Sequence, residues 1–117
     1  MCGIAGAINL DKARSKSILM SLRHRGPDEC NDLFYKNIFF VHARLSIQDI
    51  SGGQQPFEYQ HFAIIYNGEI YNHLELREVY LKECRFKTKS DTETFLHLYI
   101  KYNERMFDII DGMYAFA

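Results

Sequence analysis

The chain opens with Met1-Cys2-Gly3-Ile4-Ala5-Gly6-Ala7-Ile8-Asn9, in which small and apolar residues follow a cysteine at position 2. Residues 3–9 predict a strand built of small side chains. If Met1 is removed, Cys2 carries a free α-amino group beside its thiol. The reference pKa values of the two groups are about 8 and about 8.5, so the amine can accept the thiol proton near neutral pH. Taken alone, Cys2 fits better as a small buried residue at the start of a strand.

The rest of the chain predicts a mixture of helices and clustered strands. Residues 11–24 are expected to form a helix that Gly26-Pro27 ends, followed by a hairpin of strands at 33–35 and 38–42. A strand buried on both faces is expected at 62–66. Helices are expected at 72–83 and from Ser90 onward, each opened by a capping box: Asn72 with Glu75, and Ser90 with Glu93. Because helices and strands do not alternate strictly, this order predicts an α+β fold.

The last predicted strand, residues 113–117, has no polar exit and no closing turn after it. The strand is expected to be buried, and a buried edge strand without a following partner is a poor way to complete a domain. We therefore expect the domain to be truncated, although a short terminal strand that docks on a sheet is the alternative.

Bulk composition excludes several classes of protein. The 117 residues fit one domain at most, and the net charge of -1 gives no indication of a nucleic-acid or membrane partner. No apolar stretch is long enough to span a bilayer and no signal peptide is visible, so a cytoplasmic location is expected. The three cysteines form no CxxC and the histidines no close pair, so neither a disulfide scaffold nor a metal site is expected.

Arg44 directly follows the second strand of the predicted hairpin. Its guanidinium could bind a substrate α-carboxylate through two parallel hydrogen bonds. A surface arginine or an internal ion pair is the alternative, and the residue taken alone favours that alternative.

Asn67-Gly68-Glu69 follows the predicted buried strand. Asn-Gly between apolar runs is typical of a hairpin turn. Alternatively, the Asn67 amide and the Gly68 N–H could form an oxyanion hole, in which the loss of one donor costs about 100- to 1000-fold in rate. Asp91, in the first turn of a predicted helix, could stabilise that helix or bind a substrate ammonium group together with Glu69.

Two further groups of residues remain open. The motif Arg23-His24-Arg25-Gly26-Pro27-Asp28 could complement the helix C-terminus or cover a site. The five scattered histidines suggest no general base by their spacing, and structural roles are expected for them: His24, His42, His61, His73 and His97.

Seven motifs occur along the chain in a fixed order. They are Met1-Cys2-Gly3-Ile4-Ala5-Gly6, Arg23-His24-Arg25-Gly26-Pro27-Asp28, Ala43-Arg44-Leu45-Ser46-Ile47-Gln48-Asp49, Gly53-Gln54-Gln55-Pro56, Tyr66-Asn67-Gly68-Glu69-Ile70-Tyr71-Asn72, Ser90-Asp91-Thr92-Glu93 and Asp111-Gly112-Met113-Tyr114-Ala115-Phe116-Ala117. From end to end, this series resembles the glutaminase domain of glutamine-dependent asparagine synthetases. The related amidophosphoribosyltransferases and glucosamine-phosphate synthases fit less well.

The resemblance implies an N-terminal-nucleophile hydrolase fold, a four-layer αββα sandwich that would be incomplete at its C-terminus. Residues 1–117 would form a partial type-2 glutamine amidotransferase (glutaminase) domain that converts glutamine to glutamate and ammonia. Cys2 would attack the amide and form a thioester, and Asn67 and Gly68 would stabilise the oxyanion. The α-carboxylate would bind Arg44, and the α-amino group would bind Glu69 and Asp91.

Two departures from the family pattern limit this prediction. Family members have cysteine as their mature first residue, and a retained Met1 would hold the Cys2 amine as an amide that cannot act as a base. A synthetase domain, which would bind ATP and magnesium and make asparagine, is absent, so no cofactor is expected in this chain. Expected partners are L-glutamine, a synthetase domain or downstream chain, and a second copy of the protein. The alternatives are a non-catalytic remnant that acts as an interaction module, and an amidotransferase of a different acceptor pathway.

Overall fold

The computed structural model describes residues 2–47 and 49–117, and its N-terminal part is a helix packed on a three-stranded sheet. The elements in order are β1 (Gly3–Ile8), α1 (Lys12–Leu22), β2 (Glu29–Tyr35) and β3 (Ile38–Arg44). The strands pair antiparallel in the order β1-β3-β2. The predicted strand at the N-terminus and the hairpin are thus confirmed, and Lys36, in the hairpin turn, has φ 55°.

The C-terminal part contains two short two-stranded sheets and three helical segments. Its elements are β4 (Phe57–Tyr59), β5 (Phe62–Ile64), β6 (Tyr66–Ile70), α2 (His73–Tyr80), α3 (Asp91–Tyr102), the 3-10 helix η1 (Asn103–Asp108) and β7 (Gly112–Phe116). β4 pairs with β5, and β6 pairs with β7, both antiparallel.

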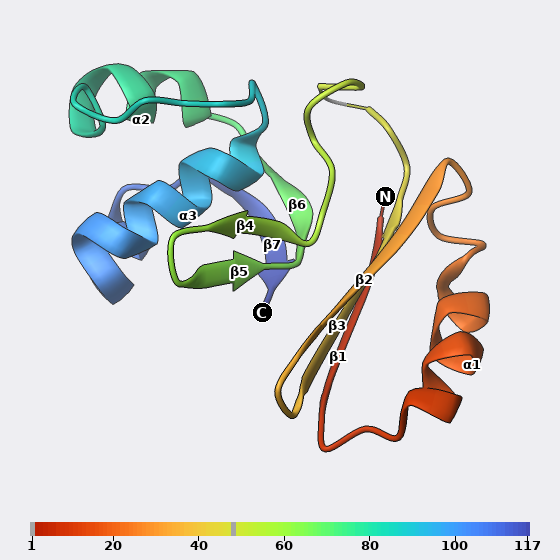
Figure 1. The fold of residues 1–117 in the computed structure, drawn as a ribbon. Coiled ribbons are helices and arrows are strands. Elements are labelled where there is room, and N and C mark those ends of the chain that lie inside the picture. Colours follow the sequence, from red (N-terminus) through yellow and green to blue (C-terminus); the bar gives the residue numbers. More distant parts are fainter. Residues whose placement is uncertain (1, 48) are drawn as a thin grey trace.

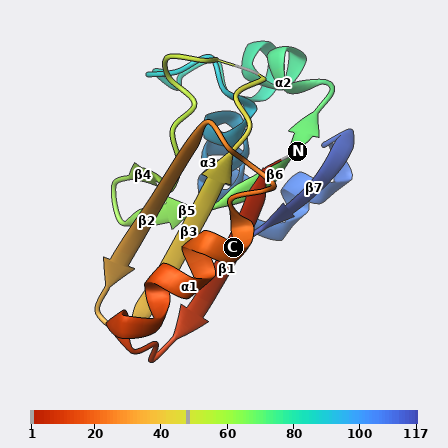
Figure 2. The ribbon, with the colours of Figure 1, turned by 90° about the vertical axis from the view of Figure 1, so that its right-hand side faces the viewer.

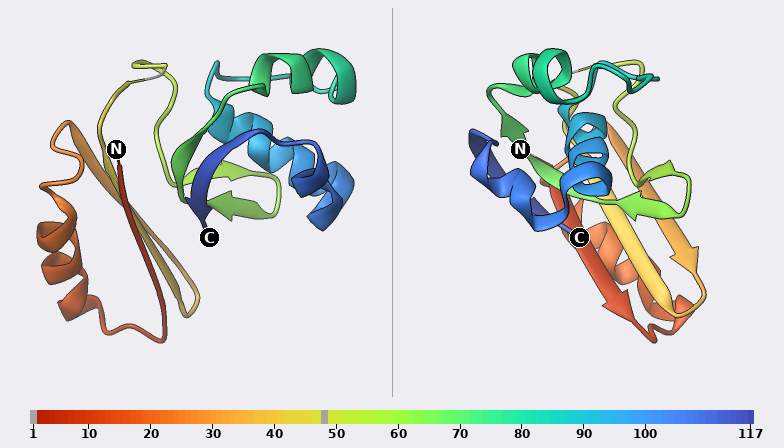
Figure 3. Two further views of the ribbon diagram at one scale, coloured as in Figure 1. Left: turned by 180° about the vertical axis from the view of Figure 1, so that it is seen from behind. Right: turned by 90° about the vertical axis from the view of Figure 1, so that its left-hand side faces the viewer.

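The elements are arranged in layers. Helix α1 lies across the outer face of the three-stranded sheet (Figure 2). The opposite face of that sheet is turned toward β4–β7, and α2 and α3 lie beyond them (Figure 1). The view from behind shows the same succession (Figure 3). The predicted mixture of α and β structure is therefore confirmed.

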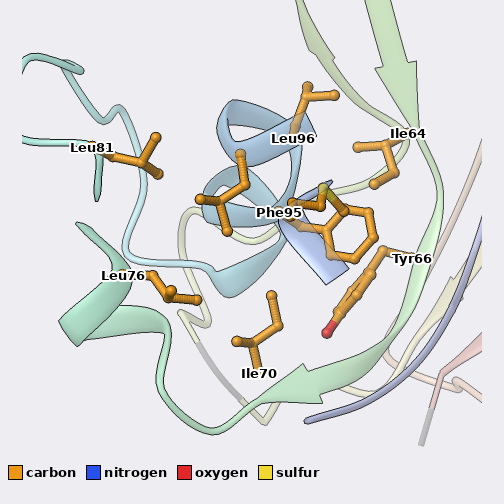
Figure 4. Packing of buried hydrophobic residues seen from close by; sticks show 9 residues of the cluster. Ile64, Tyr66, Ile70, Leu76, Leu81, Phe95 and Leu96 are labelled. Carbon is orange, nitrogen blue, oxygen red and sulfur yellow. The ribbon is translucent and has the colours of Figure 1, made fainter. Parts of the chain in front are cut away.

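The main core lies between α3 and the short sheets, and Phe95 is at its centre (Figure 4). The Phe95 side chain is 1% exposed. Its ring centroid lies 5.4 Å from that of Tyr66, 5.4 Å from that of Tyr114 and 4.7 Å from that of Phe116. Tilted and edge-on aromatic contacts of this kind stabilise a core beyond the area that they bury, so Phe95 joins α3 to both strands of the β6–β7 pair.

The predicted continuous strand at 62–66 is wrong. Phe62 is 37% exposed, and the chain divides at Ile65 into β5 and β6. The backbone N–H and C=O of Ile65 bond instead to Ala117, at 3.0 Å each. The interpretation of Asn67-Gly68 as a hairpin turn is also wrong. Both residues lie inside β6 and pair with β7, a partner far along the chain that local turn rules cannot detect.

The two predicted capping boxes have different outcomes. Ser90 is the N-cap of α3, and its Oγ accepts the Thr92 N–H at 3.2 Å, whereas Glu93 accepts backbone N–H groups of residues 87 and 88. Asn72 makes no side-chain cap. Its amide donates to the Ile109 carbonyl and its oxygen accepts the Asp111 N–H, both at 3.0 Å. The helix predicted at 72–83 is α2, which begins at His73 and ends at Tyr80.

The last strand was predicted in the right place but with the wrong burial. β7 spans Gly112–Phe116, and it pairs with β6 along its length. Met113 is nevertheless 64% exposed and Phe116 is 41% exposed, so the strand is not a buried one.

Replacing Phe95 by alanine is expected to lower the free energy of unfolding by about 3–5 kcal/mol, because a large cavity would remain between α3 and β6. Urea unfolding followed by far-UV circular dichroism measures this change. Val79→Ala, at a helix position that is 54% exposed, is the control, and it is expected to change stability by less than about 0.5 kcal/mol. Similar losses in both variants would contradict the central role of Phe95.

Candidate active site

A cavity of about 110 Å³ opens where the N-terminal sheet meets β6 and the start of α3. A buried water needs only about 10–15 Å³, so there is room for a small polar molecule. Five of the six predicted site residues line the cavity: Cys2, Arg44, Gly68, Glu69 and Asp91. Asn67 lies on β6 beside Gly68 but is not among the lining residues that the structure describes.

Cys2 is held at the wall of the cavity by contacts with the chain beyond β3. Its Sγ accepts the Leu45 N–H at 3.4 Å and lies 3.7 Å from the Leu45 carbonyl oxygen, to which the thiol can donate. The guanidinium of Arg25 donates to the Cys2 carbonyl from Nε and Nη2, each at 3.4 Å. The motif at 23–28 thus contacts the backbone of Cys2 through Arg25, although none of its residues is among the described residues that line the cavity.

Gly26 allows this approach because a side chain would not fit there. A Cβ at position 26 would lie 2.2 Å from the backbone carbonyl of Ala43 and 2.4 Å from the Arg44 nitrogen. Next to it, the Asp28 carboxylate accepts the Ser46 N–H at 2.7 Å. The turn is thus packed closely against the backbone at the end of β3.

Arg44 is buried, with only 4% of its surface exposed. Its Nη1 forms an ion pair with Glu29 at 3.1 Å and donates to the Ile50 carbonyl at 3.2 Å, and its Nη2 donates to the Asp49 carbonyl at 2.6 Å. The hydrogen bond from Asn31 and, to a smaller extent, the contact with Arg44 lower the pKa of Glu29. The internal ion pair is thus confirmed, and the same side chain also lines the cavity. Binding of a carboxylate by Arg44 stays a prediction.

Asp91 is a buried carboxylate with well-defined partners. Its Oδ2 accepts the Ile70 N–H at 3.0 Å and the Tyr66 hydroxyl at 3.2 Å. Burial and the Asp91 charge raise the pKa of Tyr66, so this hydroxyl remains a donor. Gln55 holds the same region, because its Oε1 accepts the Tyr66 N–H at 2.6 Å and its Nε2 donates to Thr92 Oγ1 at 3.1 Å.

Gly68 is required by the closeness of β6 and β7. A Cβ at this position would lie 2.3 Å from the Met113 carbonyl oxygen and 2.6 Å from the Tyr114 Cα. The absence of a side chain lets the two strands pair while the Gly68 backbone lines the cavity. Glu69, the next residue, lines the cavity near its solvent-exposed side.

His42 also lines the cavity, although its spacing in the sequence suggested only a structural role. It is 1% exposed, and within the described residues neither ring nitrogen makes a well-formed hydrogen bond. Burial lowers the pKa of His42 to about 4, and the neighbouring Tyr66 backbone and Glu29 oppose only part of this shift. Its position two residues before Arg44 on one strand, hence on the same face, is a signal that could have identified it.

The described residues give no sign of a metal or a membrane span. Across 2–47 and 49–117, no group of three or more His, Cys, Asp or Glu side chains is placed to hold a metal ion. Over the same ranges, no helix has the length and apolar character that crossing a bilayer requires.

The sequence belongs to the glutamine amidotransferase domain family, whose model matches residues 1–117. The chain is 44% identical over 125 residues to "Asparagine synthetase [glutamine-hydrolyzing] 3" of Arabidopsis thaliana, and 38% identical over 125 residues to "Asparagine synthetase B [glutamine-hydrolyzing]" of Escherichia coli strain K12. It is 38% identical over 128 residues to a third relative, "Asparagine synthetase [glutamine-hydrolyzing] 3" of Bacillus subtilis strain 168. Each match covers 100% of this chain but only 22%, 23% and 21% of the relative, respectively. The chain thus spans about a fifth of the length of these proteins.

The depressed pKa of His42 predicts a contribution to the pH dependence of stability. Between about pH 6.5 and pH 4 the unfolded chain binds a proton at this residue that the folded protein excludes. Stability should therefore fall as the pH is lowered through this window, by about 1.4 kcal/mol per pH unit from His42 alone.

Urea unfolding at several pH values, for the wild type and for His42→Gln, measures this contribution. His73 and His97, whose pKa values are also lowered by burial, are present in both proteins, so their effects cancel in the difference. We expect the variant to lose stability less steeply on acidification. Parallel curves would show that His42 is not held neutral.

Proposed function

We propose that this chain hydrolyses the side-chain amide of L-glutamine, with Cys2 as the nucleophile. The observation that carries the proposal is the convergence of Cys2, Arg44, Gly68, Glu69 and Asp91 on one cavity, although these residues are spread over 90 positions of the sequence. Membership of the glutamine amidotransferase domain family supports the choice of substrate.

The first half of the reaction forms a thioester. After removal of Met1, the α-amino group of Cys2 takes the thiol proton, and Sγ attacks the amide carbon of glutamine. The Gly68 N–H and the Asn67 side-chain amide stabilise the negative charge that develops on the amide oxygen. When the tetrahedral intermediate collapses, its C–N bond breaks, and the proton moves from the α-amine to the leaving nitrogen, which departs as ammonia.

The second half regenerates the thiol. A water molecule gives a proton to the α-amine and attacks the thioester carbon. The C–S bond then breaks, the sulfur recovers the proton, and glutamate is released. Asn67 takes part in this scheme through its position next to Gly68 on β6, and its amide has to turn toward the cavity when glutamine binds.

The amino-acid end of glutamine would be held by charges of opposite sign. Arg44 would bind the α-carboxylate, since a guanidinium offers donors in a planar fork that matches a carboxylate. Asp91 and Glu69 would bind the α-ammonium group. The Asp91 carboxylate is already oriented by Ile70 and Tyr66, so little ordering of this side chain would remain for the substrate to impose.

The fold proposed for this site is the αββα sandwich of N-terminal-nucleophile hydrolases. The succession of α1, the three-stranded sheet, the two short sheets and the α2–α3 layer supports this assignment (Figure 1). β1 also contacts β6, and Cys2 and Gly68 line the same cavity, as a mechanism that uses both residues requires.

The ammonia produced at this site would be used by a synthetase domain for asparagine formation in the cytoplasm. The names of the relatives, all glutamine-hydrolysing asparagine synthetases, support this role. ATP and magnesium would belong to the synthetase domain, and the site proposed here needs neither.

Replacing Cys2 by alanine is expected to lower glutamine turnover by at least about 1000-fold, because the nucleophile is lost. The chain should be prepared with Cys2 as its first residue, by specific proteolysis of a fusion, and the intact mass should verify that Met1 is gone. Glutamate formation measures the rate, and an acyl adduct on Cys2 should be trapped by acid quenching.

Two controls make this test decisive. Cys30→Ala removes a thiol that lies on β2 outside the cavity, and it should leave turnover unchanged. The chain that retains Met1 should be inactive, because its Cys2 nitrogen is an amide. Turnover that survives Cys2→Ala, or none in the processed wild type, would contradict the proposal.

A further inference from the structure

Asp49, which the proposed chemistry does not use, links two distant parts of the cavity wall. Its Oδ2 accepts the Lys89 N–H at 2.7 Å, across 40 positions of the sequence. Its Oδ1 accepts the Gly52 N–H at 3.1 Å, and its backbone carbonyl accepts Nη2 of Arg44 at 2.6 Å. One residue therefore contacts the predicted carboxylate-binding group on one side and the segment before Asp91 on the other.

The segment that Asp49 contacts is itself firmly held. Arg77 donates to the carbonyl oxygens of Thr88 and Ser90, at 2.9 Å and 2.6 Å. Ser90 is the N-cap of α3, so the position of this segment fixes where Asp91 begins the helix. A displacement of Lys89 would therefore move the N-cap of α3 and, with it, the backbone of Asp91, two residues further on.

The contacts of Asp49 are of a strong type. Backbone N–H groups that donate to an ionised carboxylate form bonds about twice as strong as those between neutral groups. Asp49 has φ 42°, a left-handed conformation that aspartate tolerates better than most residues. That conformation turns its carbonyl to Arg44 and its side chain to Lys89 together.

We propose that Asp49 is a positioning residue that sets the spacing between the Arg44 guanidinium and the Asp91 carboxylate. It thereby makes the site selective for amides that carry a zwitterionic α-amino-acid group. This inference rests on the proposed function, because it assigns these two groups to the two charges of the substrate. Asp49 itself touches neither the substrate nor the reacting atoms in this scheme.

The test compares two electrophiles that alkylate Cys2. The chloromethyl ketone analogue of glutamine carries the α-amino-acid group, whereas iodoacetamide is a neutral amide without it. Peptide mapping by mass spectrometry measures the rate at Cys2 separately from Cys30 and Cys84. The ratio of the two rates reports recognition of the amino-acid end, and no turnover is needed to measure it.

Asp49→Ala is expected to lower this ratio by about 10-fold or more, because small displacements of positioning groups are costly. Asp49→Asn, which keeps one acceptor oxygen but turns an NH₂ toward a donor, should lower it by a smaller factor. The rate with iodoacetamide should stay unchanged in both variants. Urea unfolding verifies that each variant is folded, and if the alanine variant is not, the asparagine variant carries the test.

Asp11→Asn is the matched control. Asp11 makes the same kind of bond, from the Ala13 N–H to its carboxylate at 3.0 Å, at the N-cap of α1 and outside the cavity wall. The ratio of the two alkylation rates at Cys2 should be the same in Asp11→Asn as in the wild type. A wild-type ratio in both Asp49 variants would overturn the positioning role alone. A wild type that reacts no faster with the glutamine analogue than with iodoacetamide would overturn the proposed glutamine site, and this inference with it.

Discussion

The buried Asp91 carboxylate is the constraint on which the arrangement of the site depends. A carboxylate that is 5% exposed is stable only if hydrogen bonds replace the water that it loses. The Ile70 N–H and the Tyr66 hydroxyl supply two such bonds, and the start of α3 supplies a favourable dipole. Both donors come from β6, so the two hydrogen bonds that stabilise the buried Asp91 carboxylate also attach α3 to β6. That attachment brings Gly68 and Glu69 to the same wall as Asp91.

At the start of α3, not only Asp91 but five consecutive polar residues are buried and need hydrogen-bond partners. Residues 90–94 are polar and all buried, where an ordinary core would have apolar side chains. Their partners include Gln55 for Thr92, Arg77 for Thr94, and backbone N–H groups for Glu93. A buried polar network that is satisfied in this way specifies one arrangement at some cost in stability. Breaks in the usual apolar pattern are expected where a protein maintains a site.

The sequence predicts the elements whose signals are local and fails where the deciding partner is remote. The first strand, the 33–42 hairpin and the Ser90 cap depend on neighbouring residues, and all are confirmed. Asn67-Gly68 and Asn72 carry equally good local signals, but β7 and residues 109–111 bind them instead. The site follows the same division. Ordered motifs identify five lining residues, and the two-residue spacing from Arg44 could have identified His42. Gln55 and Asp49 act through contacts that no spacing rule reveals.

At Arg44, the observed ion pair and the proposed substrate-binding role fall on the same side chain. A buried guanidinium must be paired, and Glu29 meets that need before any substrate binds. Glu29 is only 31% exposed, so the ion pair also limits the orientations of the guanidinium. An incoming α-carboxylate would meet a cation that is already oriented, amid the negative charges of Glu29, Glu69 and Asp91. Those charges would repel a simple carboxylate. A substrate that carries an ammonium group beside its carboxylate would satisfy both kinds of charge, and the local electrostatics of the proposed site would therefore favour an amino acid over a simple acid.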